Sequence, residues 1–336
     1  MQPRARVGAV VAGIALAAAG AVVGIVAAQS SGDGRGSAPA GAATAERPPG
    51  APPLALELGF RADPEARDLR RAAALYARGD RAGARRLFDR RRSLEAKVGS
   101  AFARWPDETV KLMGRLAALN PRSAVVQLHL GLARVWAGQP GAETAWREAA
   151  SAEPDSPYAI VAGDLLHPRF ARGLPVFVPS FPVPASITSL PPARQLGALE
   201  RAARAGGVRA RLLYGVGLQR VGRPVSARRA FAAAARLAAG DADAQVAAAV
   251  GRFDKDRPAE AFSRLGPLTR RFPGAATVRF HLGLLLLWTG ALEEAKRNRV
   301  ASTLDTTGAR LYRVPNAAAR GDAAPRAAAN CRSRRH

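Results

Sequence analysis

The sequence predicts an all-α fold, an α-solenoid of antiparallel helical hairpins, and three observations support it. Ala227, Ala261 and Ala295 recur at a spacing of about 34 residues, the length of one helix-turn-helix unit. Apolar residues make up 48% of the chain, with alanine dominant, which suits close packing of helices. Each of the three alanines also follows, at the same distance, a residue suited to a turn, namely Gly222, Asp256 or Gly290.

The best-marked unit runs from Gly215 to Ala234. Gly215 lies on the expected first helix, Gly222 in the turn, and Ala227, Phe231 and Ala234 on the second helix. Small residues let two helices approach closely, and an aromatic residue between them fills the remaining space. We therefore expect Phe231 to be buried between the helices of its hairpin and the first helix of the next.

Other units carry landmarks at comparable places, and two of them are closed by a proline that ends the second helix. An earlier turn and helix are marked by Gly79, Ala84 and Phe88, and a later second helix by Ala261, Leu265, Leu268 and Pro273. The packing residues expected elsewhere are Gly131, Gly138, Ala142, Trp146 and Ala149, closed by Pro154, and Gly283, Gly290 and Ala295.

These landmarks resemble the tetratricopeptide repeat (TPR), over roughly residues 60–154 and 194–300. The large aromatic residue expected early in the first helix is mostly missing, and the Ala- and Arg-rich composition resembles that of actinobacterial proteins. Members of the family bind peptides or proteins in a concave groove and are not enzymes. The resemblance therefore implies an unidentified protein or peptide partner.

The N-terminal segment predicts a membrane anchor. Residues 7–28 carry no charge and span about 33 Å as a helix, enough to cross a bilayer. Arg4 and Arg6 precede the segment, which places the N-terminus in the cytoplasm and the repeats outside, in a single-pass cell-membrane protein. A cleaved signal peptide is the alternative, because Val26, Ala27 and Ala28 are small enough for a peptidase site.

Composition divides the rest of the chain. Between the two blocks of repeats lies a proline-rich insert that we expect to run extended, either packed on its own solenoid or presenting Phe177 and Phe181 to a partner. The expected divisions are the anchor at 1–28, a disordered linker at 29–53, repeats at 54–156, the insert at 157–193, TPR-like repeats at 194–300, and a basic, disordered tail at 301–336.

The formal net charge of +25 points to an anionic partner. Arginines are dispersed and aromatics make up only 6% of residues, so nucleic acid is disfavoured, and an anionic lipid surface or polymer fits an extracytoplasmic domain better. The alternative is that arginine simply serves as the solvated surface residue of this chain. The basic tail has two explanations, contact with anionic lipid or a frame shift that replaced the native end.

No catalytic or cofactor motif is recognisable, and we expect no enzyme activity, no cofactor and no metal site. The four histidines, His129, His167, His281 and His336, lack metal-binding spacing. His129 and His281 occupy equivalent positions in the similar runs HLGLARVW and HLGLLLLW, which favours a packing role. Cys331 is the only cysteine, so the chain cannot form an intrachain disulfide.

The sequence thus predicts a membrane-anchored, extracytoplasmic scaffold of TPR type that mediates protein–protein interaction. The alternative is a cell-envelope assembly or structural factor that binds an anionic polymer or lipid surface through its basic face.

Overall fold

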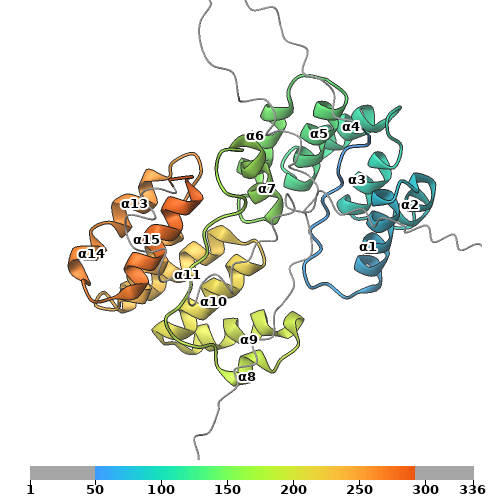
Figure 1. The fold of residues 1–336 in the computed structure, drawn as a ribbon. Helices are drawn as coiled ribbons and strands as arrows, with labels where there is room; N and C mark the ends of the chain where they lie inside the picture. Colours follow the sequence, from blue (N-terminus) through green and yellow to red (C-terminus); the bar gives the residue numbers. More distant parts are fainter. Residues whose placement is uncertain (1–49, 292–336) are drawn as a thin grey trace, which may run out of the picture.

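The computed structural model describes residues 50–291, and its regular secondary structure over that range is entirely helical (Figure 1). The predicted anchor, most of the predicted linker, Ala295 and the basic tail lie outside the described residues. Within the described part of the chain, no helix is both long and apolar enough to cross a membrane.

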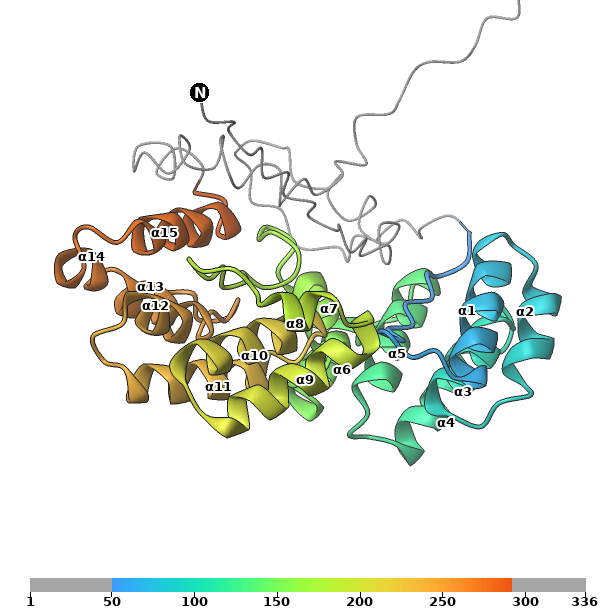
Figure 2. The same cartoon turned by 90° about the horizontal axis from the view of Figure 1, so that it is seen from below.

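The helices follow one another as a row of hairpins that runs from α1 and α2 at one end to α13–α15 at the other (Figure 2). Helices adjacent in sequence pack together, α1 on α2, α5 on α6 and α10 on α11. The N-terminal block consists of α1 (Pro64–Ala77), α2 (Arg81–Phe88), α3 (Leu94–Phe102), α4 (Thr109–Leu119), α5 (Ala124–Trp136), α6 (Ala142–Ala152) and α7 (Pro157–Leu166). The C-terminal block consists of α8 (Ala185–Thr188), α9 (Pro192–Ala205), α10 (Val208–Arg220), α11 (Pro224–Leu237), α12 (Ala242–Val250), α13 (Ala259–Leu265), α14 (Leu268–Arg271) and α15 (Ala276–Trp288).

Side-chain caps and turn glycines set the helix boundaries. Asp63 accepts a hydrogen bond of 3.0 Å from the Ala66 amide at the start of α1, and Asp241 accepts one of 2.9 Å from Ala244 at the start of α12. The turns that follow α1, α5, α10 and α15 require a left-handed backbone that glycine adopts without steric cost. They contain Gly79, Gly138, Gly222 and Gly290, whose φ angles are 86°, 65°, 71° and 79°.

Small residues on one helix of a hairpin face aromatic rings on the other. A Cβ atom built on Gly215 of α10 would collide with the Phe231 ring of α11, and one on Gly131 of α5 would collide with the Trp146 indole of α6. Each aromatic ring therefore occupies the space that the missing side chain leaves. Ala142 is half-buried, and the other helical packing residues within the described range are buried, namely Gly131, Trp146, Ala149, Gly215, Ala227, Phe231, Ala234, Ala261 and Gly283.

The insert differs from its expected form, because helix α7 occupies its first part. Pro157 stands at the start of the helix, where its missing N–H costs nothing, and the Ser156 hydroxyl accepts a hydrogen bond of 3.2 Å from the Ala159 amide. The proline thus begins a helix instead of preventing one. With α8 and α9 formed as well, the non-helical part of the insert is reduced to residues 167–184 and 189–191.

Two further boundaries differ from expectation. The second helix expected to end at Pro273 is split into α13 and α14, since Pro267 lacks the N–H needed to continue the ladder. The packed part of the chain also begins before residue 54, because Pro52, expected in the linker, is buried.

The two blocks are joined where the loop after α6 meets the start of α11. The Asp155 carboxylate accepts a hydrogen bond of 2.9 Å from the Ser226 amide and another from the Ser226 hydroxyl. Arg223, the N-cap residue of α11, provides no side-chain cap of its own. Asp155 therefore caps α11 from the neighbouring block, and this fixes the N-terminal block against the C-terminal one.

Candidate functional site

Two non-helical segments lie across the first helices of the hairpins, and we call them strap 1 (residues 51–58) and strap 2 (residues 174–183). Strap 1 forms hydrogen bonds to side chains of α1, α5 and α7, and strap 2 to side chains of α10, α12 and α15. In the order of the hairpins, α1 corresponds to α10 and α5 to α15. The two straps therefore occupy equivalent places in the two blocks.

Strap 1 is held through its main chain. The Tyr76 hydroxyl donates a hydrogen bond of 2.6 Å to the Pro52 carbonyl, and the Ala55 amide donates one of 3.2 Å to Nε2 of His129. The Glu57 amide donates to the Tyr158 hydroxyl at 3.2 Å. All three hydrogen bonds are made to main-chain atoms of the strap, so they fix the path of its backbone and do not depend on its side chains.

Strap 2 is held by a matching set. The side-chain amide of Gln219 forms two hydrogen bonds to the strap. It donates one of 3.3 Å to the Pro175 carbonyl and accepts one of 3.0 Å from the Phe177 main-chain amide. The Val178 amide donates a hydrogen bond of 2.9 Å to Nε2 of His281. The Ser180 amide donates one of 3.0 Å to the Asp243 carboxylate.

The two histidines, His129 and His281, bond the two straps with the same geometry. Nδ1 of His129 lies 2.6 Å from the Val125 carbonyl, and Nδ1 of His281 lies 2.7 Å from the Thr277 carbonyl, each one helical turn back. A carbonyl only accepts and an amide N–H only donates, so this geometry assigns each ring the neutral form with its proton on Nδ1. Nε2 is then a lone-pair acceptor aimed at the strap.

Burial keeps both rings neutral. Each lies in the core at 0% exposure, and desolvation lowers the pKa of His129 and of His281 from 6.5 to about 4. The Phe102 ring meets the His129 ring edge-on at 5.1 Å between centroids, and Phe177 stacks on His281 at 5.2 Å. Protonation would remove the lone pair that holds the strap and place a charge among aromatic rings.

Phe177 and Phe181, singled out for partner binding, both lie on strap 2. Phe177 is 1% exposed and also meets Phe231 edge-on at 5.6 Å, so its side chain belongs to the core of the C-terminal block. Phe181 is half-buried, with the Arg209 guanidinium 5.2 Å from its ring centroid. In this conformation Phe181 is the one of the two with exposed ring surface.

A buried ion pair fixes the chain as it enters strap 2. The Lys255 ammonium, 5% exposed, pairs with the Asp164 carboxylate of α7 and donates a hydrogen bond of 2.8 Å to the Ala171 carbonyl. Both carboxylate oxygens of Asp164 accept from the Gly173 amide, Oδ1 at 2.9 Å and Oδ2 at 3.0 Å. With these partners both charges are compensated, so removal of either one would leave a buried charge unpaired.

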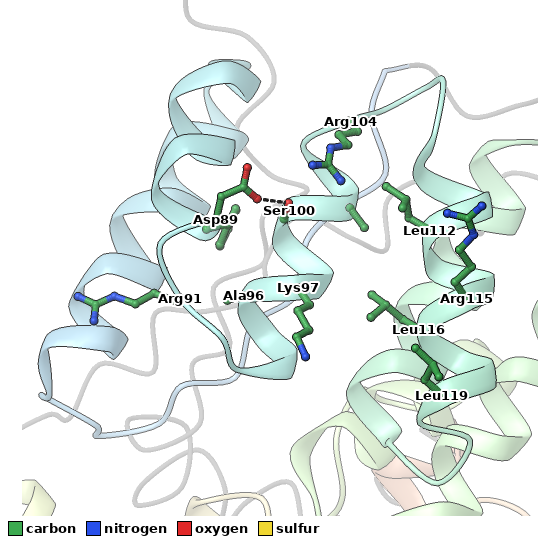
Figure 3. A pocket seen from close by; sticks show the side chains of 12 residues that line it. Asp89, Arg91, Ala96, Lys97, Ser100, Arg104, Leu112, Arg115, Leu116 and Leu119 are labelled. Carbon is green, nitrogen blue, oxygen red and sulfur yellow. Dashed lines mark hydrogen bonds between the residues drawn. The ribbon is translucent and has the colours of Figure 1, made fainter.

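A cleft of about 310 Å³ opens between α3 and α4 at the end of α2 (Figure 3). Its apolar side is formed by Leu112, Leu116 and Leu119, and Leu119 is 79% exposed. Across from these leucines lies Lys97, and Arg115 stands beside them on α4; neither forms an ion pair with any described residue. The cleft thus combines free positive charge with an exposed apolar surface.

The remaining histidines and carboxylates within residues 50–291 do not assemble a metal centre. No group of three or more His, Cys, Asp or Glu side chains there is arranged to hold a metal ion. His167, the third histidine in this range, lies 2.8 Å from the Asp256 carboxylate at the surface. His336 and Cys331 lie outside the described residues.

No protein-family model matches this chain, and no curated protein matches it significantly.

The sequence indicated that the two histidines are equivalent, but it did not indicate that they accept hydrogen bonds from the straps. The repeated HLGL run was the available signal, and it marked a helix position. Tyr76 and Gln219, which bond the two strap prolines, were not found. They occupy the same place before the turn glycines Gly79 and Gly222, a correspondence that becomes meaningful only once the straps are seen.

Proposed function

We propose that this chain is a scaffold of TPR type that mediates protein–protein interaction, anchored in the cell membrane by residues 7–28 with the repeats outside the cytoplasm. The observation that carries the proposal is the pair of strap sites. Side chains on successive first helices bond main-chain carbonyl and amide groups of an extended segment, which is the chemistry required to bind a peptide.

The helical array supports the same function. Stacked hairpins build a continuous surface in which each unit buries a face against its neighbour, and such surfaces suit extended partners. The small and aromatic residues that mark the repeats pack the helices together. The polar side chains that face the straps form hydrogen bonds to main-chain groups of the straps. A scaffold needs no further chemistry than this.

Affinity capture with the full chain as bait, from detergent-solubilised native membranes, tests the proposal. A partner recognised by main-chain bonds and apolar contacts should stay bound when the salt concentration is raised from about 50 mM to about 300 mM, because such contacts are little screened. Recovery of the same proteins on heat-denatured bait, or of none, would contradict the proposal.

The membrane topology has its own test. A reporter fused after Pro53 should be active only outside the cytoplasm, and the mature protein should stay in the membrane fraction with residues 1–28 attached. A soluble product that begins near Gln29 would instead show a cleaved signal peptide, and the scaffold would be secreted.

The alternative function, binding of an anionic polymer or lipid surface, is favoured by the cleft between α3 and α4. Lys97 and Arg115, which form no ion pair with a described residue, lie beside the exposed Leu119, a combination that suits a ligand with both negative charge and apolar groups. Long-range attraction between such charges weakens as salt increases.

Binding of polyglutamate to the full chain separates this alternative from the first. The double substitution Lys97→Glu and Arg115→Glu should weaken binding at least about tenfold at low salt, by replacing attraction with repulsion. The matched control is Arg264→Glu with Arg270→Glu, which changes the net charge equally at exposed positions of α13 and α14. Equal losses in both variants would show that overall charge, and not the cleft, binds the anion.

A further inference from the structure

The two straps share a pattern of side chains as well as a set of bonds. Strap 1 reads Pro-x-Leu-x-x-x-Leu over residues 52–58, and strap 2 reads Pro-x-Phe-x-x-x-Phe over residues 175–181. In each, the proline is buried and its carbonyl accepts a hydrogen bond from α1 or α10, and the residue bonded to the histidine comes at the same distance after the proline. The sites therefore select a spacing of apolar residues on an extended backbone.

Neither strap is part of a helix or of a strand ladder. The side chains that bond strap 2 are those of Gln219, Asp243 and His281, and the helices keep their own ladders without it. A segment held in this way can detach by local opening while the helices that carry the site stay folded.

We propose that each strap is a built-in competitor seated on an extended-peptide site, and that the partner is a protein with an extended Pro-x-apolar-x-x-x-apolar segment that replaces the strap. This inference rests on the proposed scaffold function and names its binding site and its ligand. The histidine acts as a positioning acceptor for one amide of whichever segment is bound. The bound partner and the seated strap exclude each other.

Competition of this kind sets the apparent affinity. A peptide binds only the fraction of molecules whose strap has left the site, so a seated strap weakens apparent binding by that fraction, and a weakened strap restores it. Strap 2 is the better one to test, because the Ser180 hydroxyl and the Asp243 carboxylate lie 2.6 Å apart and offer a place to tie strap and site together.

The experiment uses the full chain with Cys331 replaced by serine, and with Ser180→Cys and Asp243→Cys introduced. One sample is closed with a short reagent that links two thiols, and its matched control is capped with a reagent that reacts with single thiols. The probe is a fluorescent synthetic peptide of residues 172–184, followed by anisotropy. We expect the linked protein to bind it at least about tenfold more weakly than the capped protein.

Two further variants test whether the peptide occupies the site described. Phe177→Ser in the protein should loosen the strap and tighten peptide binding about tenfold, and His281→Leu in that background should abolish the gain. A peptide with Val178→Pro lacks the amide hydrogen that His281 accepts and should bind at least about tenfold more weakly than its parent. Equal binding to linked and capped protein, or equal binding of the two peptides, would overturn the proposal.

Amide hydrogen exchange of the unmodified protein keeps the proposal testable if the variants fail to fold. The amides of Phe177, Val178 and Ser180 should exchange at least about tenfold faster than the core amides of α10 and α12. If the strap amides exchange only at the rate of the core amides of α10 and α12, the proposal is overturned. If the linked protein captures the same partners as the capped one, the strap is no competitor while the scaffold function stands; if neither captures a partner, the scaffold function itself fails.

Discussion

The N-terminal and C-terminal blocks hold their straps with the same histidine but with different neighbours. At the proline carbonyl, Tyr76 in one block is replaced by Gln219 in the other, and the later amide is accepted by Tyr158 or by Asp243. The bonded backbone atoms stay the same while the side chains change. The difference shows that the blocks preserve the path of an extended main chain, and that the helix carrying the histidine is the part of the site least free to vary.

The blocks also differ in what packs against the imidazole. A helix residue, Phe102 of α3, covers His129, whereas the strap's own Phe177 covers His281. Strap 2 therefore contributes a large buried ring to its block, and strap 1 contributes the smaller, half-buried Leu54 at the corresponding position. We expect strap 2 to matter more for the stability of its block than strap 1 does.

The largest expected effect on stability is at the two aromatic residues that occupy equivalent positions on α2 and α11. Phe88→Ala and Phe231→Ala should each lower the free energy of unfolding by about 3–5 kcal/mol, through the lost transfer energy and the cavity left behind. The cost should be greater at Phe231, because that ring also supports Phe177 of strap 2 at 5.6 Å. Urea unfolding measures both, and an unchanged midpoint for Phe231→Ala would refute the hairpin packing described.

The helical pattern was readable from sequence because it is local. Ala227, Phe231 and Ala234 lie on one face of one helix. The aromatic residue that packs against Gly131 lies on the very next helix of the chain. The straps were readable only in part. Prolines indicated an extended segment, but Pro52 was assigned to a linker and Pro157 to an insert, since a proline before a packed segment and one that begins a helix have the same local signature.

The site itself depends on contacts between residues far apart in the chain. The bond from Val178 to His281 joins α15 to a segment that precedes α8, and no spacing rule connects them. The same holds for Asp155, which caps a helix of the other block. Only the repeated HLGL run gave a signal, since two histidines at equivalent positions indicated a shared role.

The next largest effect is the response to pH. The unfolded chain binds a proton on each histidine near pH 6.5, whereas the folded chain does so only near pH 4. Between these values the unfolded state carries more protons, so the free energy of unfolding should fall as the pH is lowered from about 6.5 to about 4 and should not depend on these groups above that range. The loss is on the order of 3 kcal/mol for each histidine.

The two blocks make this pH test sharper. In the N-terminal block burial raises the pKa of Glu57, which binds its proton more readily when folded and so offsets part of the fall. His281→Gln, which keeps an acceptor but does not titrate, should remove about one proton from the pH dependence. Urea unfolding at a series of pH values measures it, and an unchanged slope in that variant would show that His281 is already charged in the folded protein.

The smallest expected effect compares two helical glycines of the N-terminal block. Gly131→Ala should cost about 1–3 kcal/mol, because the added methyl group collides with the Trp146 indole. Gly114→Ala, on α4 with no atom within 4 Å of the added carbon, should be neutral or stabilise the protein by up to about 1 kcal/mol. Thermal unfolding of the two variants measures both, and equal effects would contradict the close approach of α5 and α6.

The most direct test of the shared strap device is the protonation state of the two imidazoles, read by nitrogen NMR on protein labelled only at histidine. The chain has four histidines, so the resonances can be assigned by substitution. We expect His129 and His281 both to stay neutral from about pH 8 to about pH 5, with the proton on Nδ1 and a hydrogen-bonded Nε2. A proton on Nε2 of either ring, or titration near pH 6.5, would contradict it, because the strap amide would then have no acceptor.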